Sequence, residues 1–162
     1  MLRIFCFISS IIILFPCYAQ QITASKGHDG PISELRFTPD GASMISASLD
    51  GSVRSWKIPS LSPLWELHFD SPVIDIALSV DGRMMAVLTK QEISLHHFDT
   101  EEEPKSTQNT NFSKQLCFSP DGSMLALAGK GIQIRMLPEL EVRESPEYVT
   151  EPYLGPNGVA FS

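Results

Sequence analysis

Three nearly identical turns recur at a fixed interval along the chain, within the pentapeptides FTPDG, LSVDG and FSPDG. Their shared turn residues are Asp40-Gly41, Asp81-Gly82 and Asp121-Gly122. The three aspartates are separated by 41 and 40 residues. Self-similarity at such a period indicates a stack or ring of identical supersecondary units. Within the first turn, proline presets the backbone, aspartate bonds to local N–H groups and glycine closes a type I turn.

Each repeat is predicted to form an antiparallel meander of at least three short strands. Apolar residues recurring along a few positions predict the first strand, as at Ile32, Leu35 and Phe37 in the first repeat. The predicted second strands are 44–48, 84–88 and 124–128, and the predicted third strands are 52–58, 93–98 and 132–137. Between the second and third strands of the first repeat, Asp50-Gly51 is typical of a tight hairpin.

A fourth strand has room in each repeat but gives a weaker signal. Residues 64–69 and 141–149 are candidates in the first and third repeats, whereas the matching stretch of the second repeat, DTEEEPKSTQNTN, is polar. Four short antiparallel strands repeating about every 40 residues describe one blade of a β-propeller. Such a blade buries both faces against its neighbours, which explains the apolar second strands MMAVL and MLALA.

The first 19 residues have the pattern of a secretory signal peptide. Arg3 supplies a positive charge, residues 4–15 form an uncharged apolar segment, and residues 17–19 end in small side chains that a signal peptidase reads. A membrane-spanning helix needs about 20 apolar residues, and this run is shorter and is interrupted by serines and a proline. We therefore expect export to the periplasm or the exterior, with no stable membrane span after cleavage before Gln20.

The charge and the cysteine content exclude several classes of partner and scaffold. The formal net charge is −7, and loss of residues 1–19 removes one basic residue and no acidic one, which leaves −8. A balance this acidic argues against nucleic acid and against anionic membrane surfaces as main partners. Of the three cysteines only Cys117 would remain, so the mature chain is not an intramolecular disulfide scaffold.

The first repeat resembles a WD40 repeat. It carries Gly27-His28, then the first strand and its FTPDG turn, then Asp50-Gly51 and Trp56 on the third strand. Three such units in phase cover residues 27–162 apart from weak stretches. The resemblance implies an all-β fold, namely a partial propeller of about three four-stranded blades and the first strand of a fourth, after the signal peptide.

The expected domain organisation follows from the repeat and the signal. A signal peptide at 1–19 precedes a WD40-like propeller region at 20–162. The expected blades cover about 27–69, about 70–109 and about 110–154, and a fourth begins at 155–162. Because propellers close with typically 4–8 blades, the chain is either a fragment of a longer protein or one of several chains that complete a ring together.

The resemblance also implies a hydrogen-bonded network within the first blade. In this family a hydrogen-bonded network joins four side chains. They are the histidine of Gly-His, a serine or threonine on the second strand, the aspartate of the next turn and the tryptophan. Carried over to this chain, the members are His28, Ser46 or Ser48, Asp50 and Trp56. Such a network satisfies buried polar groups and stiffens a small sheet. Ser-His-Asp catalysis is the alternative, but a triad is recognised by geometry and not by residue types alone.

The second and third repeats depart from the family pattern. Phe69 stands where the second repeat should have histidine, and His96 and Arg135 stand at the tryptophan position. The aspartate turn before the third strand is missing from both repeats. We therefore expect these two blades to depend on apolar packing alone.

The sequence favours a binding module over an enzyme. The resemblance implies an exported, non-enzymatic scaffold that presents its rim loops to a protein partner of unknown identity. No glycine-rich phosphate loop, paired-cysteine metal spacing or nucleophile elbow occurs in the sequence, so no catalytic residue, cofactor or metal is predicted. Two alternatives remain. One is the propeller portion of a secreted or periplasmic hydrolase or dehydrogenase truncated before its remaining domain, and the other is a non-functional gene fragment.

Overall fold

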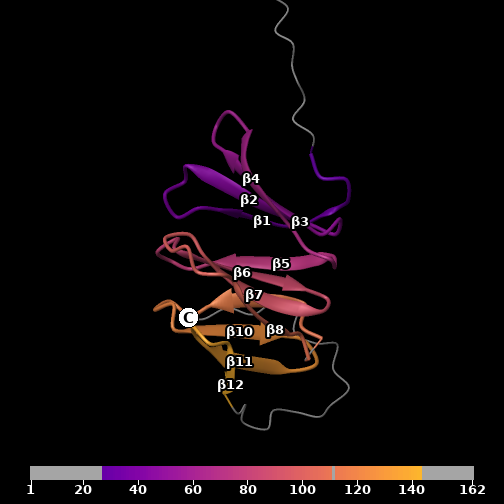
Figure 1. Ribbon diagram of the computed structural model, residues 1–162, viewed down its shortest axis with the longest axis vertical. Helices are drawn as coiled ribbons and strands as arrows, with labels where there is room; N and C mark the ends of the chain where they lie inside the picture. The colour runs from indigo at the N-terminus through magenta and orange to yellow at the C-terminus, as the bar shows by residue number, and fades with distance from the viewer. Residues whose placement is uncertain (1–26, 111, 144–162) are drawn as a thin grey trace, which may run out of the picture.

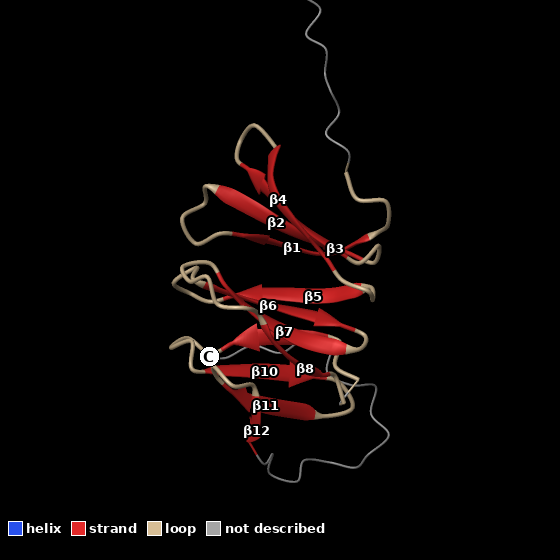
Figure 2. Ribbon diagram, in the orientation of Figure 1, coloured by secondary structure: helices blue, strands red, loops and turns tan. Residues whose placement is uncertain are grey.

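Three four-stranded antiparallel sheets make up the fold. The computed structural model describes residues 27–110 and 112–143, and no helix occurs among them. Figure 1 and Figure 2 show the sheets stacked one upon another along the long axis of the molecule. The predicted all-β architecture of blade-like sheets is therefore confirmed. The expected signal peptide (1–19) and the expected start of a fourth blade (155–162) lie outside the described residues.

Each sheet contains strands that follow one another in the chain. The first sheet consists of β1 (Ile32–Phe37), β2 (Ser43–Ser48), β3 (Ser52–Lys57) and β4 (Ser62–His68). The second consists of β5 (Val73–Leu78), β6 (Met84–Thr89), β7 (Glu92–His97) and β8 (Lys105–Gln108). The third consists of β9 (Gln115–Phe118), β10 (Met124–Ala128), β11 (Ile132–Met136) and β12 (Glu141–Arg143). Neighbours in sequence are neighbours in the sheet, so each repeat folds into one meander.

The second sheet has a fourth strand that its polar sequence did not predict. β8 pairs with β7 from Leu95↔Lys105 to Glu92↔Gln108. It is the outermost strand of its sheet, and its side chains are half-buried or exposed in alternation. Backbone pairing with β7 stabilises β8 more than burial does, and for that reason hydrophobic periodicity gave little signal there.

The core lies between the sheets in two separate layers. The first layer joins the first and second sheets through Ile45, Ala47, Val53, Val73, Ile76, Met85 and Val87. The second layer joins the second and third sheets through Ala77, Ala86, Leu88, Ile93, Leu95, Leu116, Phe118, Leu125, Leu127 and Leu140. Strand β6 contributes to both layers because alternate residues of a strand point to opposite faces. This double burial accounts for its continuous apolar run.

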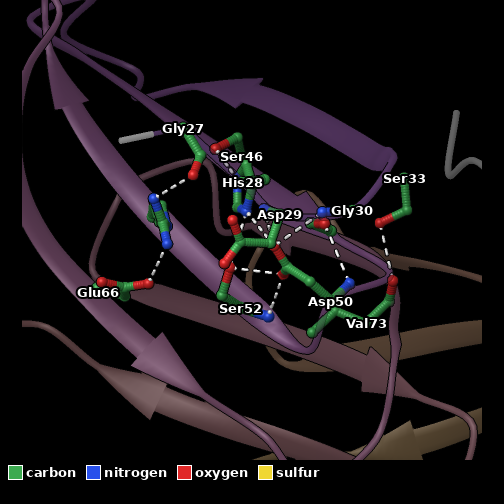
Figure 3. Close-up of polar contacts among 12 residues, drawn as sticks. Gly27, His28, Asp29, Gly30, Ser33, Ser46, Asp50, Ser52, Glu66 and Val73 are labelled. Carbon is green, nitrogen blue, oxygen red and sulfur yellow. Dashed lines mark hydrogen bonds and ion pairs between the residues drawn. The ribbon is translucent and has the colours of Figure 1, made fainter. Parts of the chain in front are cut away.

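Two hydrogen bonds from the first strands link neighbouring sheets. The Ser33 hydroxyl in β1 donates to the carbonyl oxygen of Val73 in β5 at 2.8 Å (Figure 3). The backbone N–H of Leu116 in β9 donates to Oδ2 of Asp75 in β5, also at 2.8 Å. Burial raises the pKa of the Asp75 carboxyl to about 6, although the hydrogen bond from Leu116 opposes the shift. The hydrogen bond that links the second and third sheets here therefore involves a titratable carboxyl group, that of Asp75.

Polar contacts in the second and third sheets contradict the expectation that these blades depend on apolar packing alone. Arg135 is 3% exposed, and its guanidinium donates to Thr107 Oγ1 and to the carbonyl oxygen of Gln108, both at 3.3 Å. His96 stands edge-on to Phe69, with the ring centres 5.9 Å apart. Arg135 thus bonds to β8 of the preceding sheet, whereas His96 contacts Phe69 in the segment between β4 and β5.

Candidate functional site

The hydrogen-bonded network of the first sheet begins at the indole of Trp56. This side chain is 8% exposed on β3, and its Nε1–H donates to Ser46 Oγ on β2 at 2.8 Å. The same oxygen lies 2.6 Å from Nε2 of His28. The Ser46 hydroxyl accepts from the indole and still has its own hydrogen to donate, which His28 Nε2 can accept when the imidazole proton lies on Nδ1.

On the other side of the imidazole the network continues through Ser52. Nδ1 of His28 lies 2.8 Å from Ser52 Oγ, and the Ser52 hydroxyl donates to Asp50 Oδ1 at 2.7 Å. Ser52 Oγ therefore accepts from Nδ1–H, and this assignment gives a neutral imidazole with its proton on Nδ1. Burial lowers the pKa of His28, in agreement with a neutral ring. Figure 3 shows the imidazole between the two serines.

The Asp50 carboxylate accepts hydrogen bonds from backbone N–H groups of two segments. Its Oδ2 accepts from the backbone N–H of Asp29 at 2.7 Å and of Gly30 at 3.3 Å, and its Oδ1 accepts from the N–H of Ser52 at 2.8 Å. Burial favours the protonated acid, but hydrogen bonds from Ser52 and Asp29 outweigh it and hold the pKa of Asp50 well below its usual range. Asp50 thereby fastens the segment before β1 to the β2–β3 turn (Figure 3).

Ser48 and Ser52 differ from the expected arrangement. Of the residues that the family resemblance named, the hydrogen bonds join His28, Ser46, Asp50 and Trp56. The Ser48 hydroxyl instead accepts the backbone N–H of Asp50 at 3.1 Å. Ser52, which was not predicted, connects the imidazole to the carboxylate. Its position directly after the Asp-Gly turn was the available signal, because a hydroxyl there lies within reach of the turn carboxylate.

The geometry of the network indicates a structural role, not a catalytic one. Ser46 is 2% exposed, and its hydroxyl is engaged by both the indole and the imidazole. In a Ser-His-Asp triad the carboxylate bonds directly to the imidazole, whereas here Ser52 intervenes and His28 Nδ1 is 3.5 Å from Asp50 Oδ2. Within residues 27–110 and 112–143, no group of three or more His, Cys, Asp or Glu side chains is arranged to hold a metal ion.

The three Asp-Gly turns share one arrangement. A hydroxyl two residues before each aspartate donates to its carboxylate, from Thr38 to Asp40 at 2.6 Å, from Ser79 to Asp81 at 2.5 Å and from Ser119 to Asp121 at 2.6 Å. These hydroxyls, followed by backbone N–H groups, hold the pKa of each carboxyl below its usual range. The glycines that follow, Gly41, Gly82 and Gly122, have φ of 68°, 71° and 70°. Glycine adopts this left-handed conformation without steric cost, which explains the recurring pair.

An apolar cleft lies beside the network on the outer face of the first sheet. Its volume is about 240 Å³, and it is lined by Gly27, His28, Ile32, Leu35, Met44, Ser46, Trp56 and Leu61. Ile32 is 56% exposed and Leu35 is 38% exposed. Phe37 extends this apolar strip along β1 and is 60% exposed. Side chains of this size are usually covered in a folded protein when they lie together.

Comparison of the three repeats shows which face of the second and third sheets corresponds to the outer face of the first sheet. Equivalent places in the three sheets are occupied by Trp56, His96 and Arg135. Each pairs with the second residue of the neighbouring strand β2, β6 or β10, namely Met44, Met85 or Leu125. Arg135 bonds to β8 of the preceding sheet, and Met85 packs in the core layer that joins the second sheet to the first. The face that carries Trp56 is therefore the one on which a preceding sheet would pack. In Figure 1 the first sheet stands at the end of the stack of described sheets.

Stacked four-stranded antiparallel meanders, each packing a face on the next, define the class of protein as one built from β-propeller blades. Residues 19–57 match the family model described as "WD domain, G-beta repeat". The matched segment is thus similar to a single WD40 repeat. The predicted resemblance is therefore confirmed. Among the described residues no helix is long and apolar enough to cross a membrane.

Several curated relatives share stretches of the sequence. The serine-threonine kinase receptor-associated protein of Dictyostelium discoideum is 57% identical over 37 residues, which cover 23% of this chain and 13% of that protein. The periodic tryptophan protein 2 homolog of Schizosaccharomyces pombe is 29% identical over 136 residues, covering 68% and 16%. WD repeat-containing protein 36 of Homo sapiens is 37% identical over 61 residues, covering 38% and 7%. The chain thus spans only a small part of the length of these relatives.

Two solved structures share the fold. The structure of U3-55K has a TM-score of 0.60 and 19% identity, and the match covers 74% of this chain and 40% of that one. The crystal structure of RRP9 WD40 repeats has a TM-score of 0.59 and 19% identity, covering 74% and 39%. These likenesses show that the three sheets have the arrangement of WD40 propeller blades.

Proposed function

We propose that this chain is an exported, non-enzymatic WD40 scaffold that binds another protein. The observation that carries the proposal is the exposed apolar strip of the first sheet, Ile32, Leu35 and Phe37, with the cleft beside Trp56. A contiguous exposed apolar surface is characteristic of a site for another protein. Full burial of an aliphatic or aromatic side chain stabilises a complex by about 1.5–3 kcal/mol relative to exposure.

The occupant that fits this strip is a protein that presents an apolar face of a β-sheet. Inside the chain, the first sheet packs Ile45 and Ala47 of its other face against Met85 and Val87 of the second sheet. The repeat positions make the outer face equivalent to the face that carries Met85. A partner with alternating aliphatic residues along a strand therefore matches the strip in shape and in polarity.

The names of two relatives agree with this role. One is called a serine-threonine kinase receptor-associated protein, and another, from Saccharomyces cerevisiae, is called COMPASS component SWD1. Both names describe association with other proteins. A scaffold role also fits the hydrogen-bonded network, because the Ser46 hydroxyl and the His28 imidazole are engaged within the sheet.

Export is the second part of the proposal, and it is supported by the sequence of the first 19 residues. The proposed mature chain begins at Gln20 and contains the propeller region 20–162, with blades at about 27–69, 70–109 and 110–154 and a further one beginning at 155–162. Mass spectrometry of the protein isolated from its own organism tests this proposal. A mature N-terminus at Gln20 in the extracytoplasmic fraction supports export, and an intact N-terminus in the cytoplasm contradicts it.

Site-specific photo-crosslinking tests the binding role. A photoreactive amino acid replaces Leu35 in the outer strip or, as a matched control, Val80, which is 68% exposed on the β5–β6 turn. We expect irradiation of living cells to join a discrete protein to position 35 and not to position 80. Introducing Ile32→Glu should abolish that product. Identical products at both positions, or none at position 35, would contradict the proposal.

A further inference from the structure

A second cavity lies where loops of the second and third sheets meet, away from the network of the first sheet. Its volume is about 370 Å³, and it is lined by Ile74, Lys90, Asn109, Phe112, Ser113 and Lys114. Ile74 comes from β5 and Lys90 from the β6–β7 turn, whereas the other four residues belong to the connection between β8 and β9. The cavity is therefore formed by two neighbouring repeats together.

Two lysines line this cavity and a third contacts one of its lining residues, in a chain whose net charge is −7. Lys90 and Lys114 line it, and both are exposed. Lys130, from the β10–β11 turn, places its ammonium 4.3 Å from the centre of the Phe112 ring, within the range of a cation–π interaction. Within the described part of the chain, none of these three lysines forms an ion pair. The cavity is thus lined by lysine ammonium groups that form no ion pair with the described residues.

Phe112 is held outward at the cavity in a strained conformation. Its side chain is 63% exposed and its φ is 49°, in the left-handed region that bulky residues rarely adopt. Strain of this kind persists where the surroundings impose it, often at ligand sites. Here Asn109 imposes it, because its Oδ1 accepts the N–H of Ser113 at 3.0 Å and its Nδ2 donates to the carbonyl oxygen of Thr89 at 3.1 Å.

Ser113 contributes a polar group that lacks a partner. The residue is 2% exposed, and its hydroxyl oxygen has no hydrogen-bond partner among the described residues. A buried polar group left in this state destabilises the fold. A ligand that brings an acceptor into the cavity would relieve that cost. Lysine ammonium groups, an unpartnered hydroxyl and an apolar wall together define a site for an anion attached to an apolar group.

We propose that this cavity binds an acidic peptide segment. A carboxylate of the peptide meets Lys90 and Lys114, and a neighbouring apolar side chain packs on Ile74 and Phe112. The inference rests on the proposed scaffold function, because it names the chemistry of one bound partner. A peptide fits better than a nucleic acid, since the negative charge of the whole chain repels a phosphate at every nucleotide, whereas a short peptide carries fewer charges and adds apolar side chains for Ile74 and Phe112.

Fluorescence polarisation with the purified full-length chain tests the proposal. The probe is the fluorescein-labelled peptide Glu-Leu-Glu-Phe-Glu-Leu, and its control is the uncharged peptide Gln-Leu-Gln-Phe-Gln-Leu. We expect the acidic peptide to bind at least tenfold more tightly at low salt. The double substitution Lys90→Gln and Lys114→Gln should weaken binding at least tenfold. The matched change Lys57→Gln, on an exposed lysine of β3, should alter it less than twofold.

Several outcomes overturn the proposal. Equal binding of the two peptides, or an equal loss with Lys57→Gln, shows that the cavity does not select a carboxylate. Tighter binding of a labelled hexathymidine oligonucleotide than of the acidic peptide assigns the lysines to nucleic acid instead. If the peptide fails to bind while position 35 still crosslinks a protein, this inference falls and the proposed function stands. If crosslinking also fails, both fall.

Phe112→Asn separates a binding role from a structural one. Asparagine tolerates the left-handed conformation better than phenylalanine does, so the melting temperature should stay unchanged or rise. The affinity for the acidic peptide should nevertheless fall several-fold, because the apolar contact is lost. A fall in melting temperature with unchanged affinity would assign Phe112 to folding and contradict its place in the site.

Discussion

The indole N–H of Trp56 donates to the hydroxyl of Ser46 at 2.8 Å, and the same hydroxyl lies 2.6 Å from the imidazole of His28. One serine therefore joins the second strand, the third strand and the segment before the first strand of the same sheet. At the equivalent position of the third sheet, Arg135 instead bonds to β8 of the preceding sheet. The first sheet is thus fastened internally on the face where no described sheet covers it.

Removal of the Ser46 hydroxyl should destabilise the fold. Ser46→Ala leaves the indole N–H of Trp56 and the Nε2 of His28 without their partner, and an unsatisfied buried group costs about 1–3 kcal/mol. Urea denaturation measures the free energy of unfolding. The control Ser106→Ala changes an exposed serine of β8 and should stay within about 0.5 kcal/mol of the unmodified chain. Equal effects of the two substitutions would contradict the structural role of the network.

The two glycines Gly41 and Gly51 should respond differently to replacement by alanine. Both have positive φ, of 68° and 87°, so each substitution incurs the left-handed cost of about 1–2 kcal/mol. A Cβ at Gly41 meets no atom within 4 Å, whereas a Cβ at Gly51 would lie 2.6 Å from the carbonyl oxygen of Phe69. Thermal denaturation should therefore show a clearly larger loss for Gly51→Ala. Equal losses would mean that the β2–β3 turn does not pack against the end of β4 as described.

The Asp75 carboxyl should make stability depend on pH in a window set by its two pKa values. Its pKa rises from an ordinary 3.8 to about 6 in the folded protein, chiefly through burial. The folded state then binds the proton more tightly than the unfolded state does, so stability due to this group falls as the pH rises from 4 to 6. The full difference corresponds to about 3 kcal/mol at most.

The substitution Asp75→Asn isolates this effect. Burial lowers the pKa of His28 and His96, which acts in the opposite direction over a neighbouring pH range, but both histidines are common to the two proteins. The difference in unfolding free energy, variant minus unmodified chain, should therefore become more positive between pH 4 and pH 6. A difference that stays constant across that range would contradict a buried, proton-binding Asp75.

Those parts of the fold that are governed by local chemistry could be predicted from the sequence. The Asp-Gly turns could be predicted because glycine is needed at φ near 70°. Strand β6 could be predicted because both of its faces are apolar. The family resemblance implied a fourth strand in the second sheet, but the residues of β8 gave little signal because a polar edge strand is held by its neighbour's backbone. Ser52 and Arg135 escaped it because their partners, His28 and Gln108, are brought close only by the folded sheets.

The separation of the core into two layers is the claim on which the account of both sites depends. Methyl-selective NMR with isotope-labelled Ile, Leu, Val and Met tests it most directly. We expect nuclear Overhauser contacts from Ile45 and Val53 to Met85 and Val87, and a separate set from Leu88 and Leu95 to Leu125 and Leu127. Contacts from Ile45 or Val53 to Leu125 or Leu127 would show that the sheets do not stack in this order, and would contradict the account.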